Sequence, residues 1–254
     1  MTHDLWQLVE IIGSCRFVDL THAFQPGIPH AAGMPDEERV TLYDFDVGEG
    51  TLGAGFLIHQ YRHVGQWGTH VDPPAHFVRG GRFLDEIPVS DMVLPLVAFD
   101  VRHEVAANPD YELDLKAVRS WEERHGRIPP RAFAVMHTGW AARWPDAEAM
   151  RNAGSDGVAR FPGWGIEALR YLIDVCGARA FGHETTDTDT GANVSADRYP
   201  AERFLLERDR YQIEMLANLA SVPPAGAIAI ASFPKPLRGS GFPARVFAIC
   251  PRTE

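Results

Sequence analysis

Proline and glycine interrupt this chain so often that no regular element can be long. The 254 residues include 19 Pro and 23 Gly, spread along the whole sequence. Proline removes a backbone hydrogen-bond donor and fixes φ, and glycine favours turns, so both residues end helices and strands. We therefore expect a fold of many short elements. Because no repeat or low-complexity linker divides the chain, residues 1–254 are predicted to form a single domain.

Apolar patterns predict which short elements these are. Short apolar runs predict strands at residues 17–20, 40–47, 94–101, 133–137, 179–182, 227–233 and 245–250. Helices are predicted over 114–125, with Asp114 as its N-cap, and over 165–176. A third helix is predicted over 201–219, bent or interrupted near Asp209. Because strands and helices interleave without a strict βαβ rhythm, the predicted fold class is α/β with a mixed sheet.

Composition excludes several classes of protein. The chain has 24 Lys+Arg and 34 Asp+Glu, a formal net charge of -10, which argues against binding to nucleic acid, whose phosphates attract basic side chains. No apolar stretch approaches the roughly 20 residues that cross a bilayer. The first residues lack the features of a secretion signal. The three cysteines form no CxxC pair, so we expect reduced, buried thiols in a soluble, cytoplasmic protein.

The densest group of polar side chains lies in Gln66-Trp67-Gly68-Thr69-His70-Val71-Asp72-Pro73-Pro74-Ala75-His76. In an extended segment His70 and Asp72 point to the same side, and the two prolines that follow end the strand, so that His76 can fold back toward the same space. Two imidazoles and a carboxylate suit a divalent ion such as zinc or manganese. The alternative is a hydrogen-bonded His/Asp turn on the surface, but the spacing favours a metal or catalytic site.

Three other segments leave alternatives open. Residues 48–53 match GxGxxG, but no clear helix follows, so a glycine-rich loop is a better interpretation than a dinucleotide site. Residues 183–189 (His-Glu-Thr-Thr-Asp-Thr-Asp) either contribute to a site or form a solvated acidic loop. Glu214 lies between apolar neighbours. It is either a solvent-facing helix residue, which the sequence alone favours, or a buried carboxylate that needs a cation.

The segment 68–76, GTHVDPPAH, resembles the signature HxGTHxDxPxH of the metal-dependent cyclase family, which includes bacterial kynurenine formamidase and isatin hydrolase. Supporting likenesses run through most of the chain, at Val18-Asp19-Leu20-Thr21-His22, His137-Thr138-Gly139-Trp140, Phe161-Pro162-Gly163-Trp164 and Gly239-Ser240-Gly241-Phe242-Pro243-Ala244-Arg245. The resemblance implies a mixed-sheet, swivelling β/β/α fold that assembles as a homodimer or homotetramer.

The resemblance also implies a set of site residues. In the family the first His, the GTH His and the Asp bind one divalent ion. A second ion can share the Asp and take a His and a Glu twelve residues later, and the last His transfers protons. Carried over to this chain, His70, Asp72 and Glu214 match as metal ligands, and His76 matches as the acid/base residue.

Two departures from the signature make the donor set richer in oxygen. Gln66 stands where the first His is expected, and Glu202 stands twelve residues before Glu214, where a second His is expected. Amide and carboxylate oxygens favour manganese relative to zinc, bound as one or two ions per chain. Further candidates for the lost imidazole, or for a place near the site, are His183, Glu184 and His63.

This set predicts a metal-dependent hydrolase that acts on a small-molecule substrate. An imidazole such as His76 can accept a proton from water and return it to a leaving amine or alcohol. The predicted reaction is hydrolysis of a small amide, lactam, formamide or ester, in the manner of an arylformamidase or cyclic amidase acting on non-peptide C–N bonds. Two alternatives stay open: a metal-dependent cyclase or dehydratase that acts through an enolate, and a small-molecule-binding protein that lost the chemistry. Trp67, Trp140 and Trp164 are expected in the core.

Overall fold

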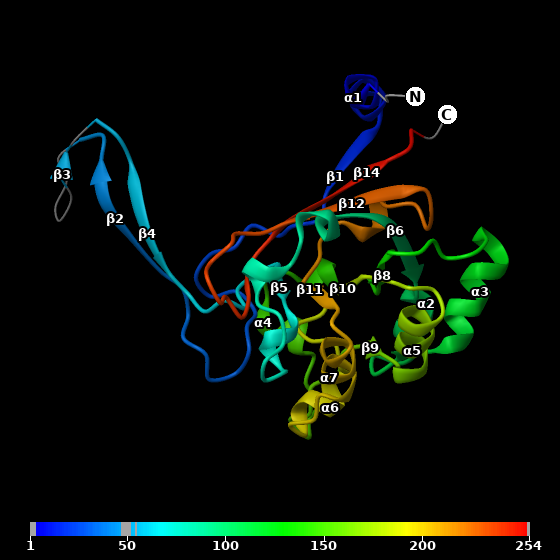
Figure 1. Ribbon diagram of the computed structural model, residues 1–254. Helices are drawn as coiled ribbons and strands as arrows, with labels where there is room; N and C mark the ends of the chain where they lie inside the picture. The colour runs from blue at the N-terminus through cyan, green and yellow to red at the C-terminus, as the bar shows by residue number, and fades with distance from the viewer. Residues whose placement is uncertain (1–3, 47–51, 54, 253–254) are drawn as a thin grey trace.

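A nine-stranded mixed sheet forms the body of the protein in the computed structural model, which describes residues 4–46, 52–53 and 55–252 (Figure 1). Its strands are β1 (Arg16–Asp19), β5 (His70–Asp72), β6 (Val93–Asp100), β8 (Phe133–His137), β10 (Ala180–His183), β11 (Tyr211–Glu214), β12 (Ala227–Ser232), β13 (Phe242–Pro243) and β14 (Arg245–Cys250). They lie in the order β1-β14-β12-β6-β8-β10-β11-β5-β13. The four central strands β6, β8, β10 and β11 are parallel, and the flanking pairs are antiparallel. The predicted α/β class with a mixed sheet is confirmed.

Helices cover one face of this sheet. The helices among the described residues are α1 (Leu5–Ser14), α2 (Arg102–Ala107), α3 (Leu115–His125), α4 (Ala147–Arg151), α5 (Ile166–Asp174), α6 (Gly191–Ser195) and α7 (Pro200–Glu207). Helix α5 packs against both α3 and α7 on that face, whereas α1 projects away from the body (Figure 1). Among the described residues, no helix combines the length and the apolar character that crossing a bilayer requires.

Both faces of the central strands are buried. Along β8, Ala134 and Met136 pack against the helices, and Phe133 and Val135 pack into a second core against β12 and β14. A strand buried on both sides reads as a continuous apolar run, which is why the sequence predicted β8 with its observed bounds. The parallel strands thus form a rigid platform whose polar ends carry the candidate site residues.

Two smaller sheets complete the fold. The strands β2 (Glu38–Asp44), β3 (Leu52–Gly53) and β4 (Ile58–Arg62) form a hairpin-like arm that projects from the body (Figure 1). The strands β7 (Glu112–Leu113) and β9 (Gly163–Trp164) pair beside the helices. The GxGxxG motif at 48–53 lies mostly outside the described residues.

Most predicted elements are confirmed, and one is wrong. The side chain of Asp114 accepts a hydrogen bond from the Ala117 amide and caps α3, as its sequence predicted. The single bent helix predicted over 201–219 does not exist: α7 ends at Glu207, Asp209 has a φ of 57°, and the chain continues as β11. All four residues of β11 are buried, and the strand lies between β10 and β5 in the sheet. Its sequence therefore lacks the alternation of apolar and polar residues that would have distinguished it from a helix.

Candidate functional site

Two antiparallel strands place three side chains that could bind a metal ion on one face of the sheet. In the register of β5 and β11, His70 lies opposite Glu214, and Asp72 lies opposite Gln212. Residues directly opposite on paired strands point to the same face. His70 Nε2 is 3.3 Å from Asp72 Oδ2 and 3.5 Å from Glu214 Oε2. One donor atom from each of the three residues lies within 4.8 Å of the other two, and all three residues are buried. The surface-turn interpretation of His70 and Asp72 is therefore wrong.

His70 is oriented with its Nε2 toward the carboxylates. Its Nδ1 lies 2.8 Å from the carbonyl oxygen of Gly68, which only a protonated Nδ1 can satisfy. The other ring nitrogen, Nε2, faces Asp72 and Glu214. Burial lowers the pKa of His70, but the charge and hydrogen bond of Asp72 outweigh burial and raise it overall. Such an outer hydrogen bond is the usual way in which a protein orients a metal-binding imidazole.

Glu202 extends this group of carboxylates from α7. Pro200 is the first residue of α7, and the carboxylate of Asp189 accepts hydrogen bonds from the Ala201 and Glu202 amides at the N-terminus of the helix. This cap directs Glu202 toward the sheet, where its side chain is buried. Burial raises the pKa of Asp189 to about 6.

The carboxylates form an acidic cluster with an unusual surplus of negative charge. Burial and mutual repulsion raise the pKa of Asp187, Glu202 and Glu214 well above the ordinary value. Burial opposes ionisation of Asp72 too, but His70 and its other neighbours hold the pKa of Asp72 below its ordinary value. In the described part of the chain, the side chains within ion-pair distance of these carboxylates are histidines. A bound divalent cation would neutralise this charge.

The solvent-facing helix interpretation of Glu214 is wrong. Glu214 ends the buried strand β11 and is 5% exposed. The structure shows the burial that the other alternative required. The strand pairing with β5, which the sequence does not show, decides it.

Gln212 is a polar residue at the centre of the site that sequence reasoning missed. Its Nε2 lies 2.9 Å from Glu202 Oε1, 3.1 Å from Glu214 Oε1 and 3.3 Å from Asp72 Oδ2. Its Oε1 accepts a hydrogen bond from the hydroxyl of Thr188. The side chain is fully buried. The spacing of Gln212 two residues before Glu214 could have indicated that both side chains point to the same face, but only if the segment had been predicted as a strand.

Gln66 and His76 lie at the solvent-accessible edge of the cluster. His76 ends the 3₁₀ helix η1 (Pro74–His76), which follows β5, so the predicted fold-back occurs. Its Nε2 is 3.9 Å from Glu202 Oε1, and 31% of its side chain is exposed. The amide nitrogen of Gln66 lies 3.2 Å from Asp72 Oδ1.

The three further candidates, His183, Glu184 and His63, lie in different places relative to the cluster. His183 is fully buried and lies 3.7 Å from Glu214 Oε1, but its two nitrogens contact Thr185 and Thr188. Burial lowers the pKa of His183 to about 3, so the ring is neutral. The segment 183–189 is thus mostly buried, and the solvated-loop interpretation is wrong.

Glu184 and His63 do not join the cluster. The carboxylate of Glu184 turns toward the loop after β8, where it accepts hydrogen bonds from the Thr138 and Gly139 amides at 2.6 Å. Burial raises the pKa of Glu184. The half-buried His63 contacts the carbonyl of Val64 and the ring of Phe242.

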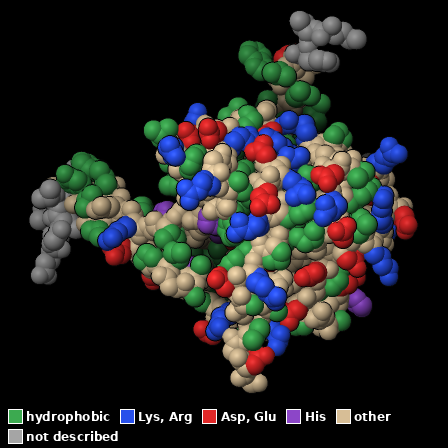
Figure 2. All heavy atoms as spheres, turned by 60° about the horizontal axis from the view of Figure 1, so that its bottom comes forward, with side chains coloured by type: hydrophobic (Ala, Val, Ile, Leu, Met, Phe, Trp, Pro, Cys, Tyr) green, Lys and Arg blue, Asp and Glu red, His purple; other side chains and the backbone are tan. Residues whose placement is uncertain are grey.

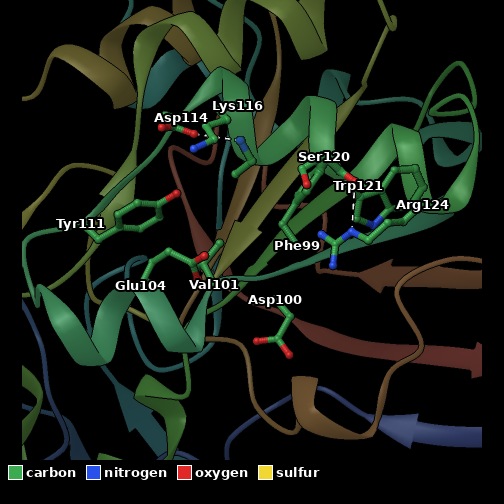
Figure 3. Close-up of a pocket in the computed structure, with 11 residues that line it drawn as sticks. Phe99, Asp100, Val101, Glu104, Tyr111, Asp114, Lys116, Ser120, Trp121 and Arg124 are labelled. Atoms are coloured by element: carbon green, nitrogen blue, oxygen red, sulfur yellow. Dashed lines mark hydrogen bonds between the residues drawn. The ribbon is translucent and has the colours of Figure 1, made fainter.

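A cavity of about 320 Å³ lies away from these residues, between α2, α3 and β6 (Figure 3). Lys116 and Arg124 of α3 line it together with Glu104 of α2 and Asp100 at the end of β6, so its lining carries both signs of charge. It contains none of the candidate site residues. Trp67, Trp140 and Trp164 are buried in the core, as expected.

Comparison with known proteins identifies several relatives. A family model described as "Putative cyclase" matches residues 18–190. An isatin hydrolase from Roseibium aggregatum is 31% identical over 250 aligned positions, and the match covers 94% of this chain and 94% of that one. The structure of isatin hydrolase A from Labrenzia aggregata, bound to benzyl benzoate, is similar with a TM-score of 0.87 and 34% identity, over 98% of this chain and 99% of that one. An isatin hydrolase bound to the product analogue thioisatinate gives a TM-score of 0.88 with 29% identity, over 98% of each chain.

Proposed function

The chain belongs to the cyclase family, and on that premise we propose that it is a divalent-metal-dependent hydrolase that opens the C–N bond of a small cyclic amide. The observation that carries the proposal is the convergence of His70, Asp72 and Glu214 in a buried acidic cluster. Ligands about 2.1 Å from one tetrahedral ion are roughly 3.4 Å apart. The contacts of His70 Nε2 with the two carboxylates, 3.3 and 3.5 Å, fit that spacing.

We propose that His70, Asp72 and Glu214 hold the ion, with Glu202 and Gln66 as further candidate donors. These candidate ligands offer more oxygen atoms than nitrogen atoms, which favours manganese relative to zinc. Their number is sufficient for one ion or for two. When bound, a divalent ion polarises a carbonyl group and lowers the pKa of water. The buried carboxylates favour a cation over any anionic ligand.

His76 is proposed to move the proton. Hydrolysis adds the oxygen of water to the amide carbon, breaks the C–N bond and leaves a carboxylate and an amine. The proton lost by water has to reach the departing nitrogen. His76 lies at the open edge of the cluster and is the partly exposed imidazole there, so it can reach both the cluster and an incoming substrate. Isatin is the first substrate to test, because the similar proteins are isatin hydrolases.

The test uses the full chain with added Mn²⁺ or Zn²⁺, isatin as the probe and water enriched in ¹⁸O. We expect ring opening with one labelled oxygen in the new carboxylate. His70→Ala is expected to lose both metal and turnover, and His76→Ala to keep metal while kcat falls by about 10²–10⁴-fold. His103→Ala, an exposed histidine on α2, is the matched control and should behave as the wild type.

Other outcomes would contradict the proposal in distinguishable ways. A product formed without ¹⁸O would favour the cyclase or dehydratase reaction. Binding of isatin without turnover, in protein that holds no metal after reconstitution, would favour the binding-protein alternative. Turnover of an arylformamide but not of isatin would keep the hydrolase and reject the cyclic substrate.

We also propose that two copies of the chain, or four, associate. None of the residues of α1 is buried, and Trp6 of this helix is 82% exposed. The arm exposes a second apolar set, and Figure 2 shows hydrophobic side chains gathered on both projections. Exposed apolar surface of this extent marks contact sites. Sedimentation equilibrium of the full chain should give a dimer or tetramer, whereas a monomer at micromolar concentration would reject the proposal. Residence in the cytoplasm stays a prediction.

A further inference from the structure

The strands β1, β14 and β12, which we call the wing, point bulky apolar side chains away from the core. The strand register sets Phe17, Ile249 and Ile228 in one row across the three strands. The next row contains Phe247 and Ile230. Residues directly opposite on paired strands point to the same face. All five side chains are at least partly exposed, and they belong to neither core of the described part of the chain.

The opposite face of the wing carries smaller side chains. Its inward positions include the buried residues Ala227, Ala229 and Ala231 of β12 and Ala248 of β14. An antiparallel sheet with one face in the core and the other in water normally places apolar residues inward and polar residues outward. The wing instead has small apolar residues inward and large apolar residues outward. Its outer face therefore has the composition of a contact surface.

Helix α1, which precedes β1, also exposes apolar side chains to water. None of its residues is buried, and Leu5, Trp6, Val9 and Ile11 are 61–82% exposed. A helix of 10 residues is shorter than the about 12–15 residues that an isolated helix needs to be even marginally stable in water. Figure 1 shows α1 projecting from the body at the start of β1. Within the described residues, the helix and the outer face of the wing thus each lack an apolar partner.

We propose that α1 and the outer face of the wing form a self-complementary surface that binds a second copy of the chain, with α1 of each copy lying on the wing of the other. A symmetric pair of this kind covers the helix and the wing of both copies at once. A different protein would have to supply both an apolar helix and an apolar sheet face to do the same. The inference specifies the surface of the association proposed above, on which it rests, and it is independent of the substrate.

The area and the charge of this surface fit a second copy. The exposed parts of the apolar side chains on α1 and the wing amount to roughly 1,000 Å² per copy, whereas each partner in a stable interface contributes about 800 Å². The net charge of -10 opposes self-association. On the outer face of the wing, however, the charged residues Asp19 and Arg245 form an ion pair with each other at 2.7 Å. Two copies can therefore meet there without bringing unpaired charges together.

The first test is sedimentation equilibrium of the full chain at micromolar concentration. Ile228→Glu places a carboxylate on the wing, and Trp6→Glu places one on α1. Because a symmetric pair contains each substitution twice, either variant should raise the dissociation constant by about 100-fold or more. Both positions are exposed in the single chain, so the variants should keep the far-UV circular dichroism of the wild type. Leu237→Glu, at an exposed apolar residue outside this surface, is the matched control and should keep the wild-type constant.

A cross-link shows whether α1 meets the wing of another copy or of its own chain. Val9→Cys and Ile228→Cys are made separately, each combined with Cys15→Ser and Cys176→Ser to remove the partly exposed native thiols. Mild oxidation of the mixture should join the two variants as a covalent pair, and either variant alone should form much less of it. If a chain with both substitutions forms the disulfide within one monomeric copy, the proposal is overturned.

The remaining outcomes separate this proposal from the others. A monomeric wild type would reject a second copy as the occupant of this surface and would reject the association as well. An oligomer that survives both Ile228→Glu and Trp6→Glu would reject this surface but keep the association, with the arm as its contact site. The hydrolase is tested separately, by turnover of isatin in the wild type, and its failure would leave the sedimentation and cross-linking results unchanged.

Discussion

Replacing Gln212 by leucine tests whether its amide holds the acidic cluster together in the metal-free protein. The side chain is fully buried, and its two N–H protons are shared among three carboxylates at 2.9–3.3 Å. A hydrogen bond to the ionised Asp72 contributes about 1.5–3 kcal/mol, and one to a carboxyl group of raised pKa contributes about 0.5–1.5 kcal/mol, so losing one of each costs about 2–4.5 kcal/mol. Leucine has a similar volume, so little of this loss comes from a cavity. The remaining carboxylates would face one another without a donor between them.

The assay is urea unfolding of Gln212→Leu and wild type at pH 7.5 in the presence of a chelator. With an m-value of about 2–3 kcal/mol/M, the unfolding midpoint should fall by roughly 1–2 M. Gln60→Leu, in the exposed part of β4, is the matched control and should change stability by less than about 0.5 kcal/mol. A loss below about 1 kcal/mol for Gln212→Leu, at unchanged m, would refute the role of Gln212 as the donor that compensates the cluster.

Three further predictions follow from other contacts. Saturating Mn²⁺, at about 100 times Kd, should stabilise the wild type by about 2.7 kcal/mol, or roughly 5–11 °C in Tm, and Glu214→Gln should lose at least half of that rise in differential scanning calorimetry. Gly241→Ala should lower the free energy of unfolding by about 1–3 kcal/mol and reduce turnover, because its Cβ would displace the Gln66 amide. Unchanged stability and activity would contradict the close contact between Gly241 and Gln66. Burial lowers the pKa of His22, stacked on Trp144, to about 4, so its folded form binds fewer protons than its unfolded form and stability falls as pH drops from 6.5 toward 4. In His22→Phe, the stability lost between pH 6.5 and pH 4 should be smaller by about 1–2 kcal/mol, a figure that allows for the partial exposure of the ring. Parallel curves of stability against pH for the variant and the wild type would refute this.

Much of the fold could be predicted because local rules decided it. The strand β8 is an apolar run of four residues followed by His137, and α3 has an Asp N-cap and is followed by Gly126. These features are properties of neighbouring residues, so no tertiary information was needed. The segment that carries Glu202 and Glu214 was different. A helix followed by a buried strand has no alternation to mark the change, and the turn at Asp209 lacks the usual glycine.

The candidate site was predictable where one short segment supplied it. His70, Asp72 and His76 are held by the strand and the prolines of their own sequence, so their relative positions follow from local geometry. Gln212 and the orientation of Gln66 could not be predicted, because each depends on partners far away in the sequence.

The sequence by itself determined the kinds of chemical group at this site and the short elements that carry them. Only the tertiary structure decided which groups meet and how charged they are. Antiparallel pairing of β5 with β11 sets His70 against Glu214, and the cap on α7 brings in Glu202. Burial then removes the water that would have screened their charges. A carboxylate has the same composition on a surface or in a core, but its need for a cation arises from what surrounds it, and that is a property of the fold.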